Sequence, residues 1–284
     1  MVFCLIFKFE SPKLVRISNL KAHFYQNFAK ITRKGKIMLK RIIIGVCLFA
    51  ALILVAWLDI FWLNFAIFAA IVALAVHESL KLWGADFEPL VLIAVAFFTL
   101  TPFGEGINDV FKVILLNLAT VAAALAYTKS ENLNYLLPFI YPAAPIFMMF
   151  ALYQEFGMSC LVWLIFTVVA CDSGAYFVGK MIGKHPFSAS SPNKTFEGVV
   201  GGLVLGAVLG TCFGWIFVDM SSGMVALTAI LVAIFGVFGD LFESYLKRRA
   251  GVKDTSHLLG EHGGVLDRID GYLFGVIAMF LALA

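Results

Sequence analysis

Carboxylates and cations recur at helical spacing in the last fifth of the chain. Asp240 follows a long apolar run, and Glu243, Ser244, Lys247 and Arg248 come three, four, seven and eight residues after it. Residues at these intervals lie on one face of an α-helix. A carboxylate within an apolar segment is costly unless it faces a polar cavity or a partner. The spacing therefore predicts a polar stripe that begins within a membrane helix and rises to the membrane surface.

A second polar set follows the stripe, in residues 247–270. It combines two carboxylates, a histidine and two adjacent glycines, which are Asp267, Asp270, His262, Gly263 and Gly264. Its cations include Lys247, Arg248, Lys253 and Arg268. Glycines let a backbone approach a ligand closely or take a positive φ. Carboxylates beside such a turn suit Mg²⁺, and the cations suit phosphate oxygens. We therefore expect a metal and phosphate site in this segment.

A third polar stretch lies upstream, in residues 171–202. Asp172 follows another apolar run, and SASSPNKTFEG (residues 188–198) offers hydroxyl groups, Lys194 and a glycine at the start of a predicted helix. The unpaired amides of a helix N-terminus favour anions, so this loop is expected to handle phosphate, although it lacks the spacing of a P-loop. The glycines on the following helix predict close helix packing rather than ligand contact; they are Gly198, Gly201, Gly202, Gly206 and Gly210.

The elements that position these residues must be membrane helices. The chain has 284 residues, of which 62% are hydrophobic and 14% charged, whereas about 25% of a soluble domain is charged. Its mean hydropathy is +0.96. Apolar runs near the ~20 residues of a membrane-spanning helix recur along the chain. We predict an all-α, polytopic integral membrane protein with about nine transmembrane helices, at residues 42–58, 60–77, 88–104, 110–127, 134–153, 159–179, 198–218, 223–246 and 271–284.

The distribution of Lys and Arg predicts the orientation of those helices. With the N-terminus in the cytoplasm, nearly all loop cations fall on the cytoplasmic side, and the opposite loops carry mainly Asp and Glu. The loops at 180–197 and 247–270 then lie on the same side, where they can meet. We therefore expect the site to face the cytoplasm from the cell inner membrane.

Residues 1–37 form a basic extension with eight Lys and Arg, interleaved with apolar residues. We interpret it as a cytoplasmic segment that lies on anionic lipid, rather than as a nucleic-acid-binding arm, so no nucleic-acid partner is predicted. The alternative is that translation starts at Met38. Residues 38–170 then form a transmembrane helical part, and residues 171–284 form a catalytic transmembrane part with two cytoplasmic polar loops.

The polar residues of this catalytic part resemble the signature of the phosphatidate cytidylyltransferases, also called CDP-diacylglycerol synthases. The matching positions near the C-terminus are Ser244, Leu246, Lys247, Arg248, Lys253, Asp254, His262, Gly263, Gly264, Asp267, Arg268 and Asp270. Those upstream are Asp172, Ala175, Tyr176, Ser191, Pro192, Lys194, Thr195, Glu197 and Gly198. The resemblance covers about residues 38–284. Two departures are Ser173, where the family often has Thr, and the absence of a Pro-Gly step before His262.

This resemblance implies that CTP and phosphatidate react to give CDP-diacylglycerol and pyrophosphate. It also implies a homodimer in the inner membrane and a requirement for Mg²⁺, with potassium as an optional second cation. By analogy Asp240 and Asp267 would be the main metal ligands, with Asp270 and Asp172 as second candidates. The basic residues would hold the triphosphate and the lipid phosphate, in a division that the sequence leaves open.

Two other functions remain open on the sequence. A CTP-dependent lipid or polyprenol kinase would transfer the γ-phosphoryl group and release CDP. A transporter could also place acids within helices, but it would more naturally show inverted repeats and polar residues at mid-membrane. The polar residues of this chain gather instead at one predicted membrane surface, which favours the enzyme.

Overall fold

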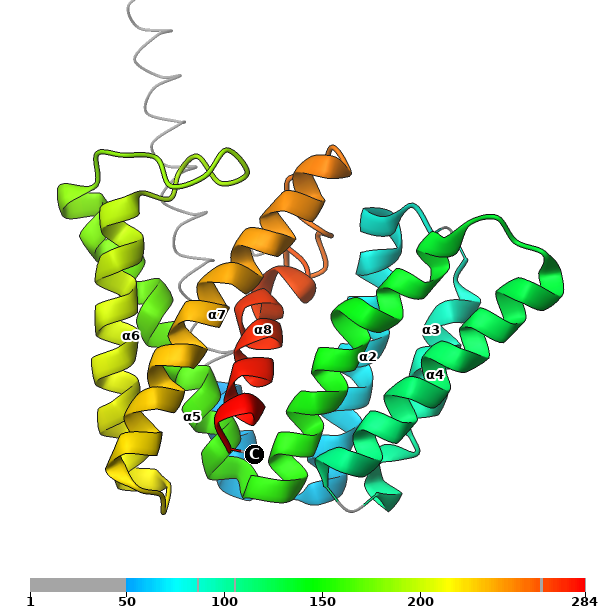
Figure 1. Ribbon diagram of the computed structural model, residues 1–284, viewed down its shortest axis with the longest axis horizontal. Helices are drawn as coiled ribbons and strands as arrows, with labels where there is room; N and C mark the ends of the chain where they lie inside the picture. Colours follow the sequence, from blue (N-terminus) through cyan, green and yellow to red (C-terminus); the bar gives the residue numbers. More distant parts are fainter. Residues whose placement is uncertain (1–49, 86, 105, 261–262, 284) are drawn as a thin grey trace, which may run out of the picture. The chain divides into compact units, whose positions relative to one another are not determined.

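The computed structural model describes residues 50–85, 87–104, 106–260 and 263–283, and its regular elements are helices. Residues from Leu54 onward form one compact unit, which is the part described below. Its longer helices are α2 (Phe61–Trp83), α3 (Pro89–Phe98), α4 (Ile107–Thr128), α5 (Ala144–Ile182), α6 (Phe196–Phe217), α7 (Ser222–Arg249) and α8 (Leu266–Leu283) (Figure 1). Three short helical turns, Thr101–Phe103, Leu133–Leu136 and Phe139–Ala143, link them. The predicted all-α class is confirmed.

Within the described residues, five helical segments have the length and hydropathy of a membrane span. They are Phe61–Trp83, Ile107–Thr128, Leu133–Ile182, Phe196–Phe217 and Ser222–Arg249. This supports a membrane protein but does not confirm a count of nine. Residues 42–49 of the expected span at 42–58 lie outside the described residues, and α3 has only ten residues.

The longest segment is bent at Gly157, which divides α5 into two arms. Gly157 has φ +78° and ψ 178°, a conformation outside the helical region that residues with a side chain rarely adopt. Figure 1 shows the two arms of α5 as a V with its turn at one end of the bundle. The expected spans at 134–153 and 159–179 fall on these two arms.

The last helix begins earlier than the hydropathy predicted. We expected residues 271–284, with Asp267 and Asp270 in the preceding loop, but α8 runs from Leu266 to Leu283. The expected boundary is wrong because Asp267 in the first turn stabilises the positive end of the helix dipole, so a charged residue here does not end the helix. Both carboxylates are therefore held on a helix rather than on a flexible loop.

Glycines bring α6 against the second arm of α5, as the sequence predicted. A Cβ atom on Gly202 would lie 2.5 Å from the carbonyl oxygen of Cys171, and one on Gly210 would lie 2.6 Å from the hydroxyl of Thr167. Trp163 also donates a hydrogen bond of 2.7 Å from Nε1 to the carbonyl oxygen of Gly210. This close approach fixes the position of the α5 residues that follow Cys171.

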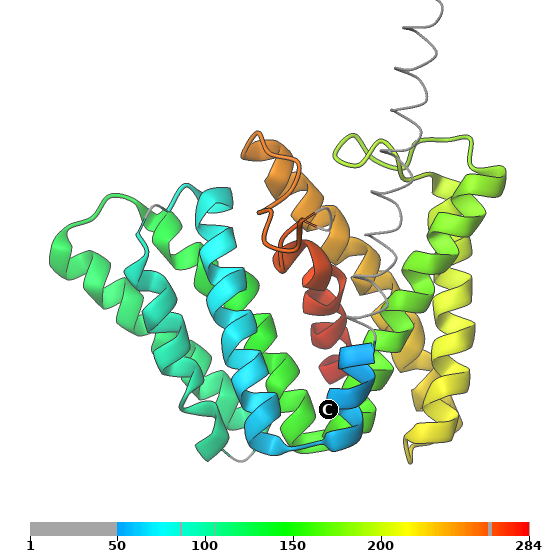
Figure 2. The ribbon, with the colours of Figure 1, turned by 180° about the vertical axis from the view of Figure 1, so that it is seen from behind.

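The two long polar loops lie at the same end of the bundle. Figures 1 and 2 both show residues 183–195, residues 250–265 and the C-terminal ends of α2 and α7 at this end. The turn at Gly157 and the link between α6 and α7 lie at the other end. The predicted meeting of the two polar loops is thus compatible with the fold, and contacts between them are given below.

Candidate active site

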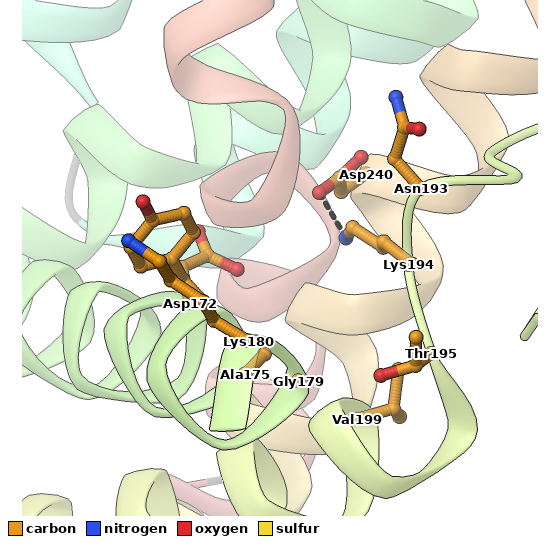
Figure 3. A pocket seen from close by; sticks show the side chains of 10 residues that line it. Asp172, Ala175, Gly179, Lys180, Asn193, Lys194, Thr195, Val199 and Asp240 are labelled. Atoms are coloured by element: carbon orange, nitrogen blue, oxygen red, sulfur yellow. Dashed lines mark hydrogen bonds and ion pairs between the residues drawn. The ribbon is translucent and has the colours of Figure 1, made fainter. Parts of the chain in front are cut away.

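A pocket of about 400 Å³ opens between α5, α6, α7 and the loop at 183–195. Its lining residues are Asp172, Ala175, Tyr176, Gly179, Lys180, Asn193, Lys194, Thr195, Val199 and Asp240. Figure 3 shows Asp172 and Lys180 on α5, across the pocket from Asp240 on α7. Two polar regions that lie far apart in the sequence, residues 171–202 and the stripe that begins at Asp240, therefore contribute to one cavity.

Lys194 and Asp240 form an ion pair at the edge of this pocket. The Lys194 ammonium donates to Asp240 Oδ2, and the Ser244 hydroxyl lies 3.3 Å from Asp240 Oδ1. The side chains of Lys194 and Asp240 are each 25% exposed. Burial acts to lower the pKa of Lys194, but the carboxylates of Asp240 and Asp172 outweigh it and hold that pKa above its ordinary value. Lys194 therefore stays cationic at neutral pH.

The loop at 183–195 owes its shape to a narrow backbone hairpin. Phe187 N donates to the carbonyl oxygen of Lys194 at 2.8 Å, and Phe196 N donates to that of His185 at 2.9 Å. Thr195 caps α6 by accepting a hydrogen bond from Gly198 N at 3.2 Å. These contacts confirm the predicted helix start after Thr195 and direct Lys194 towards α7.

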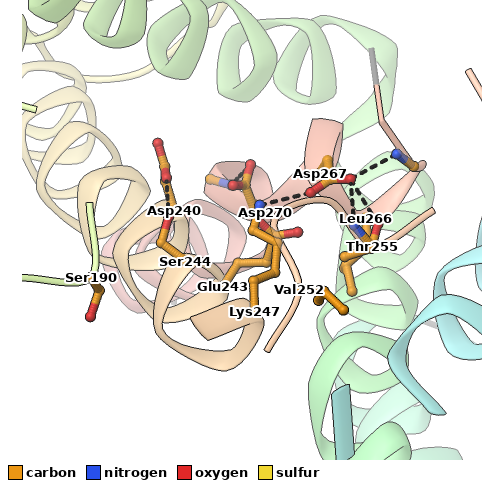
Figure 4. A network of polar contacts seen from close by, with 12 residues as sticks. Ser190, Asp240, Glu243, Ser244, Lys247, Val252, Thr255, Leu266, Asp267 and Asp270 are labelled. Atoms are coloured by element: carbon orange, nitrogen blue, oxygen red, sulfur yellow. Dashed lines mark hydrogen bonds and ion pairs between the residues drawn. The ribbon is translucent and has the colours of Figure 1, made fainter. Parts of the chain in front are cut away.

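A second charged group lies one turn further along α7 (Figure 4). The Lys247 ammonium lies 2.6 Å from Glu243 Oε2 and 2.7 Å from Asp267 Oδ1, so it joins α7 to α8. The side chain of Glu243 is fully buried, and that of Asp267 is 5% exposed. The predicted stripe on α7 is confirmed as a set of residues that share one face and make contacts with one another.

Asp267 also organises the backbone of the segment before α8. Its Oδ2 accepts hydrogen bonds from Thr255 N at 2.9 Å, Thr255 Oγ1 at 2.8 Å and Gly264 N at 2.7 Å. Gly263 has φ +79°, and a Cβ atom on it would lie 2.6 Å from Asp267 Oδ2. The two glycines were expected to let the backbone approach a ligand closely or take a positive φ, and Gly263 takes one. In the structure they admit protein groups, because Asp267 and its neighbours occupy the space beside them.

Glu78 on α2 completes this polar group, although the sequence patterns gave it no role. Its carboxylate accepts hydrogen bonds from Ser256, Thr255, Val265 and Leu266, 177 to 188 residues away along the chain. An acid near the end of an apolar run was the only local signal. The partners could not be read from the sequence, because they depend on how α2 packs.

The carboxylates differ in how well they could bind a divalent cation. Asp240 is partly exposed and lines the pocket with Asp172. Both oxygens of Asp267 already accept hydrogen bonds. In the described part of the chain, no group of three or more His, Cys, Asp or Glu side chains is arranged to hold a metal. Each carboxylate is paired with a lysine, so a metal would displace Lys194 from Asp240 and Lys247 from Asp267. Asp240 is the more accessible of the two, because its side chain is 25% exposed and that of Asp267 is 5% exposed.

Some of the remaining predicted residues contact these groups. Arg248 Nε lies 3.4 Å from the carbonyl oxygen of Ser190, which joins the two polar loops, while Ser191 closes the turn that presents Lys194. Asp270 lies one turn after Asp267 on α8, beside Glu243 (Figure 4). The exposed ones are Tyr176, Arg248, Lys253, Asp254 and Arg268. His262 lies outside the described residues.

Comparisons with known proteins show the family to which the chain is similar. A model described as "Cytidylyltransferase family" matches residues 39–284. A phosphatidate cytidylyltransferase of Helicobacter pylori (strain J99 / ATCC 700824) is 38% identical over 245 residues, which is 86% of this chain and 91% of that protein. A phosphatidate cytidylyltransferase of Bacillus subtilis (strain 168) is 39% identical over 133 residues, which is 46% of this chain and 49% of that protein.

Proposed function

The chain belongs to the cytidylyltransferase family, and we propose that it joins phosphatidate to the cytidine monophosphate unit of CTP. An oxygen of the phosphatidate phosphate attacks the α-phosphorus of CTP. The bond from that phosphorus to the β-phosphate oxygen breaks, and pyrophosphate leaves. The products are CDP-diacylglycerol and pyrophosphate, and the reaction belongs to phospholipid biosynthesis.

One observation carries this proposal: carboxylates and lysines from distant parts of the sequence line the same pocket. Asp172 and Lys180 come from α5, Lys194 comes from the following loop, and Asp240 comes from α7. Phosphoryl chemistry between two anions needs cations that reduce repulsion and stabilise the leaving group. A lipid phosphate requires these groups near the membrane surface, and the pocket lies at the end of the bundle where the polar loops gather.

The attacking group needs little activation by the protein. A phosphate monoester has a second pKa near 6, so it is mostly a dianion at about pH 7. The protein's contribution is therefore to bind the two anions in line and to balance their charge. We assign this to the cations that surround the pocket and the segment after α7, which are Lys194, Lys247, Arg248, Lys253 and Arg268.

Mg²⁺, when bound, would reduce the charge of the triphosphate and stabilise the departing pyrophosphate. Asp240 would hold it, with Asp172 across the pocket and Asp267 as a further ligand once Lys247 moves. In this arrangement Lys194 and Lys247 serve as the counter-charges of the carboxylates when no metal is present, and they become available to phosphate oxygens when one is.

We place this site at the cytoplasmic face of the inner membrane. The positive-inside distribution of Lys and Arg supports that orientation, and CTP is a cytoplasmic nucleotide. The family resemblance further supports a homodimer. Mass measurement of the detergent-solubilised protein would test that state directly.

Following the α-phosphate of CTP tests the reaction itself. Purified protein receives phosphatidate, Mg²⁺ and CTP labelled at the α-phosphorus. Label in the lipid fraction together with released pyrophosphate supports the proposal. Label that remains in water-soluble CDP would identify a CTP-dependent kinase instead. Intact CTP with each lipid phosphate offered would contradict both enzymes and favour transport.

A further inference from the structure

Glu78 is a buried carboxylate that gathers four hydrogen bonds from one distant segment. Its side chain lies near the end of α2, and the residue is 3% exposed. Its Oε1 accepts from Ser256 Oγ at 2.6 Å and Val265 N at 3.0 Å. Its Oε2 accepts from Leu266 N at 2.8 Å and Thr255 Oγ1 at 3.0 Å. All four donors belong to the stretch that leads into α8.

A charge in this position must be compensated by its neighbours. Among the residues that the structure describes, no Lys, Arg or His forms an ion pair with Glu78. The compensation comes from two hydroxyl groups and from two amides at the N-terminus of α8, where the helix dipole favours a negative charge. Because burial without these donors would be costly, Glu78 and the segment 255–266 hold each other in place.

Thr255 carries the effect of Glu78 to Asp267. The Thr255 hydroxyl lies 3.0 Å from Glu78 Oε2 and 2.8 Å from Asp267 Oδ2, and the Thr255 amide donates to the same oxygen of Asp267. The hydroxyl has a single proton, so the two carboxylates share one donor. A displacement of Glu78 would therefore change the hydrogen bonding of Asp267, and through Asp267 that of Lys247.

Gly264 shows how closely these groups are packed. A Cβ atom at this position would lie 2.2 Å from Thr255 Oγ1 and 2.4 Å from Glu78 Oε2. Only a residue without a side chain lets the Glu78 carboxylate approach the amides of Val265 and Leu266. Gly264 thus leaves the space that the Glu78 carboxylate occupies, where α2 meets the start of α8.

We propose that Glu78 is a positioning residue, which holds Thr255, Ser256, Val265 and Leu266 against α2 and thereby sets the geometry of Asp267 and Lys247. The effect of Glu78 on activity rests on the proposed function of those two residues. Its effect on the segment does not, because ordering of the backbone can be measured without substrate.

The experiment compares Glu78→Gln and Glu78→Ala with the wild-type protein, all full length and in detergent. The glutamine keeps the volume and one acceptor, so it also serves if the alanine variant fails to fold. Ser79→Ala is the matched control, because Ser79 is buried on the same helix but donates only to Val76 O of its own helix, at 2.7 Å.

Hydrogen exchange is followed in residues 255–266 and, for reference, in the loop at 183–195. We expect the Glu78 variants to exchange at least about tenfold faster in the first segment, with the reference loop unchanged. We expect kcat to fall by about 10–100-fold, the range for residues that orient the groups contacting substrate or metal, with a smaller change in KM. Ser79→Ala should change neither quantity.

A double variant tests whether Gly264 and Glu78 act as a unit. Gly264→Ala alone should raise exchange in 255–266 and lower kcat. If the two residues act together, the Glu78→Ala, Gly264→Ala double variant should lower kcat by a smaller factor than the product of the two factors measured for the single variants. A decrease in kcat equal to the product of the two single decreases would contradict this coupling between Glu78 and Gly264.

Two results would overturn the proposal. The first is unchanged exchange of residues 255–266 in both Glu78 variants. The second is faster exchange with full activity, in a protein where Asp267→Asn is inactive, because Asp267 would then matter without needing Glu78. If Asp267→Asn is itself fully active, the assigned function of Asp267 has failed, and Glu78 no longer positions a group that the reaction needs.

Discussion

The ammonium group of Lys194 pairs with the carboxylate of Asp240, although 46 residues separate them in the chain. This contact joins the loop between α5 and α6 to the first residue of the polar stripe on α7. It also closes one side of the pocket that Asp172 lines from α5. The pair therefore brings together a cation suited to phosphate and a carboxylate suited to a metal.

Asp240→Asn is expected to remove activity while leaving the protein in the membrane. Loss of the negative charge would deprive the proposed Mg²⁺ of its first ligand and Lys194 of its partner, and we expect a decrease in kcat of at least about 100-fold. Transfer of labelled CMP to lipid measures it. Glu88→Gln is the control, because Glu88 pairs with His77 in exposed positions on the same end of the bundle. Normal turnover in Asp240→Asn would refute the metal assignment.

Lys194→Met should lower activity strongly, because it removes the positive charge. Lys194→Arg should retain more activity because it keeps the charge, but less than wild type because the shape of the side chain differs. Since the pKa of Lys194 is held above its ordinary value, its ion pair is fully present below the usual lysine pKa of about 10.4 and is lost only above that. The difference in Tm between wild type and Lys194→Met should therefore be constant from about pH 7 to about pH 9. A difference that shrinks within that range would show that the pair titrates earlier.

Gly202→Ala is expected to destabilise the packing of α5 on α6. Its Cβ atom would lie 2.5 Å from the carbonyl oxygen of Cys171 and 2.8 Å from the Cβ atom of Ala175. We expect a loss of about 1–3 kcal/mol in the free energy of unfolding, with lower activity because Asp172 follows Cys171 directly. Gly223→Ala on α7 is the matched control, since no atom lies within 4 Å of its added Cβ. Equal thermal stability of the two variants would contradict this account of the helix contact.

Gly157→Ala tests the bend in α5 by strain alone. An added Cβ atom there would meet no atom within 4 Å, but φ +78° and ψ 178° are nearly restricted to glycine. The substitution should cost about 1–3 kcal/mol of stability, measured by thermal unfolding in detergent. Ser159→Ala, two residues further on in an exposed position, should have little effect. A Gly157→Ala protein as stable as wild type would show that the backbone at residue 157 does not need a conformation restricted to glycine.

Local periodicity predicted the parts of the site that lie on single helices. The i, i+3 and i+4 spacing after Asp240 correctly placed Glu243 and Ser244 on one face, because a helix fixes that geometry within a few residues. The glycines of α6 were also interpreted correctly as packing positions, since their small size has few other uses along a helix. The family resemblance then supplied the chemistry that spacing alone left open.

Contacts between helices were not predictable from the same patterns. The start of α8 was placed too late because hydropathy treats Asp267 as a loop residue, whereas helix N-termini favour acids. Glu78 was given no role, because its partners lie about 180 positions away. The positive φ expected at the glycine pair is found at Gly263, but nothing near Gly263 and Gly264 in sequence reveals that Asp267, Thr255 and Glu78 fill the space beside them.

The four hydrogen bonds of Glu78 have a consequence for recombining parts of related proteins. A chimera that joins residues 1–170 of one relative to residues 171–284 of another would separate Glu78 from the hydroxyls, the amides and the glycine that receive it. Inheritance of the C-terminal segment alone would then be insufficient, and α2 would have to be transferred with it. The two halves of the molecule are therefore expected to have changed together during evolution at these positions.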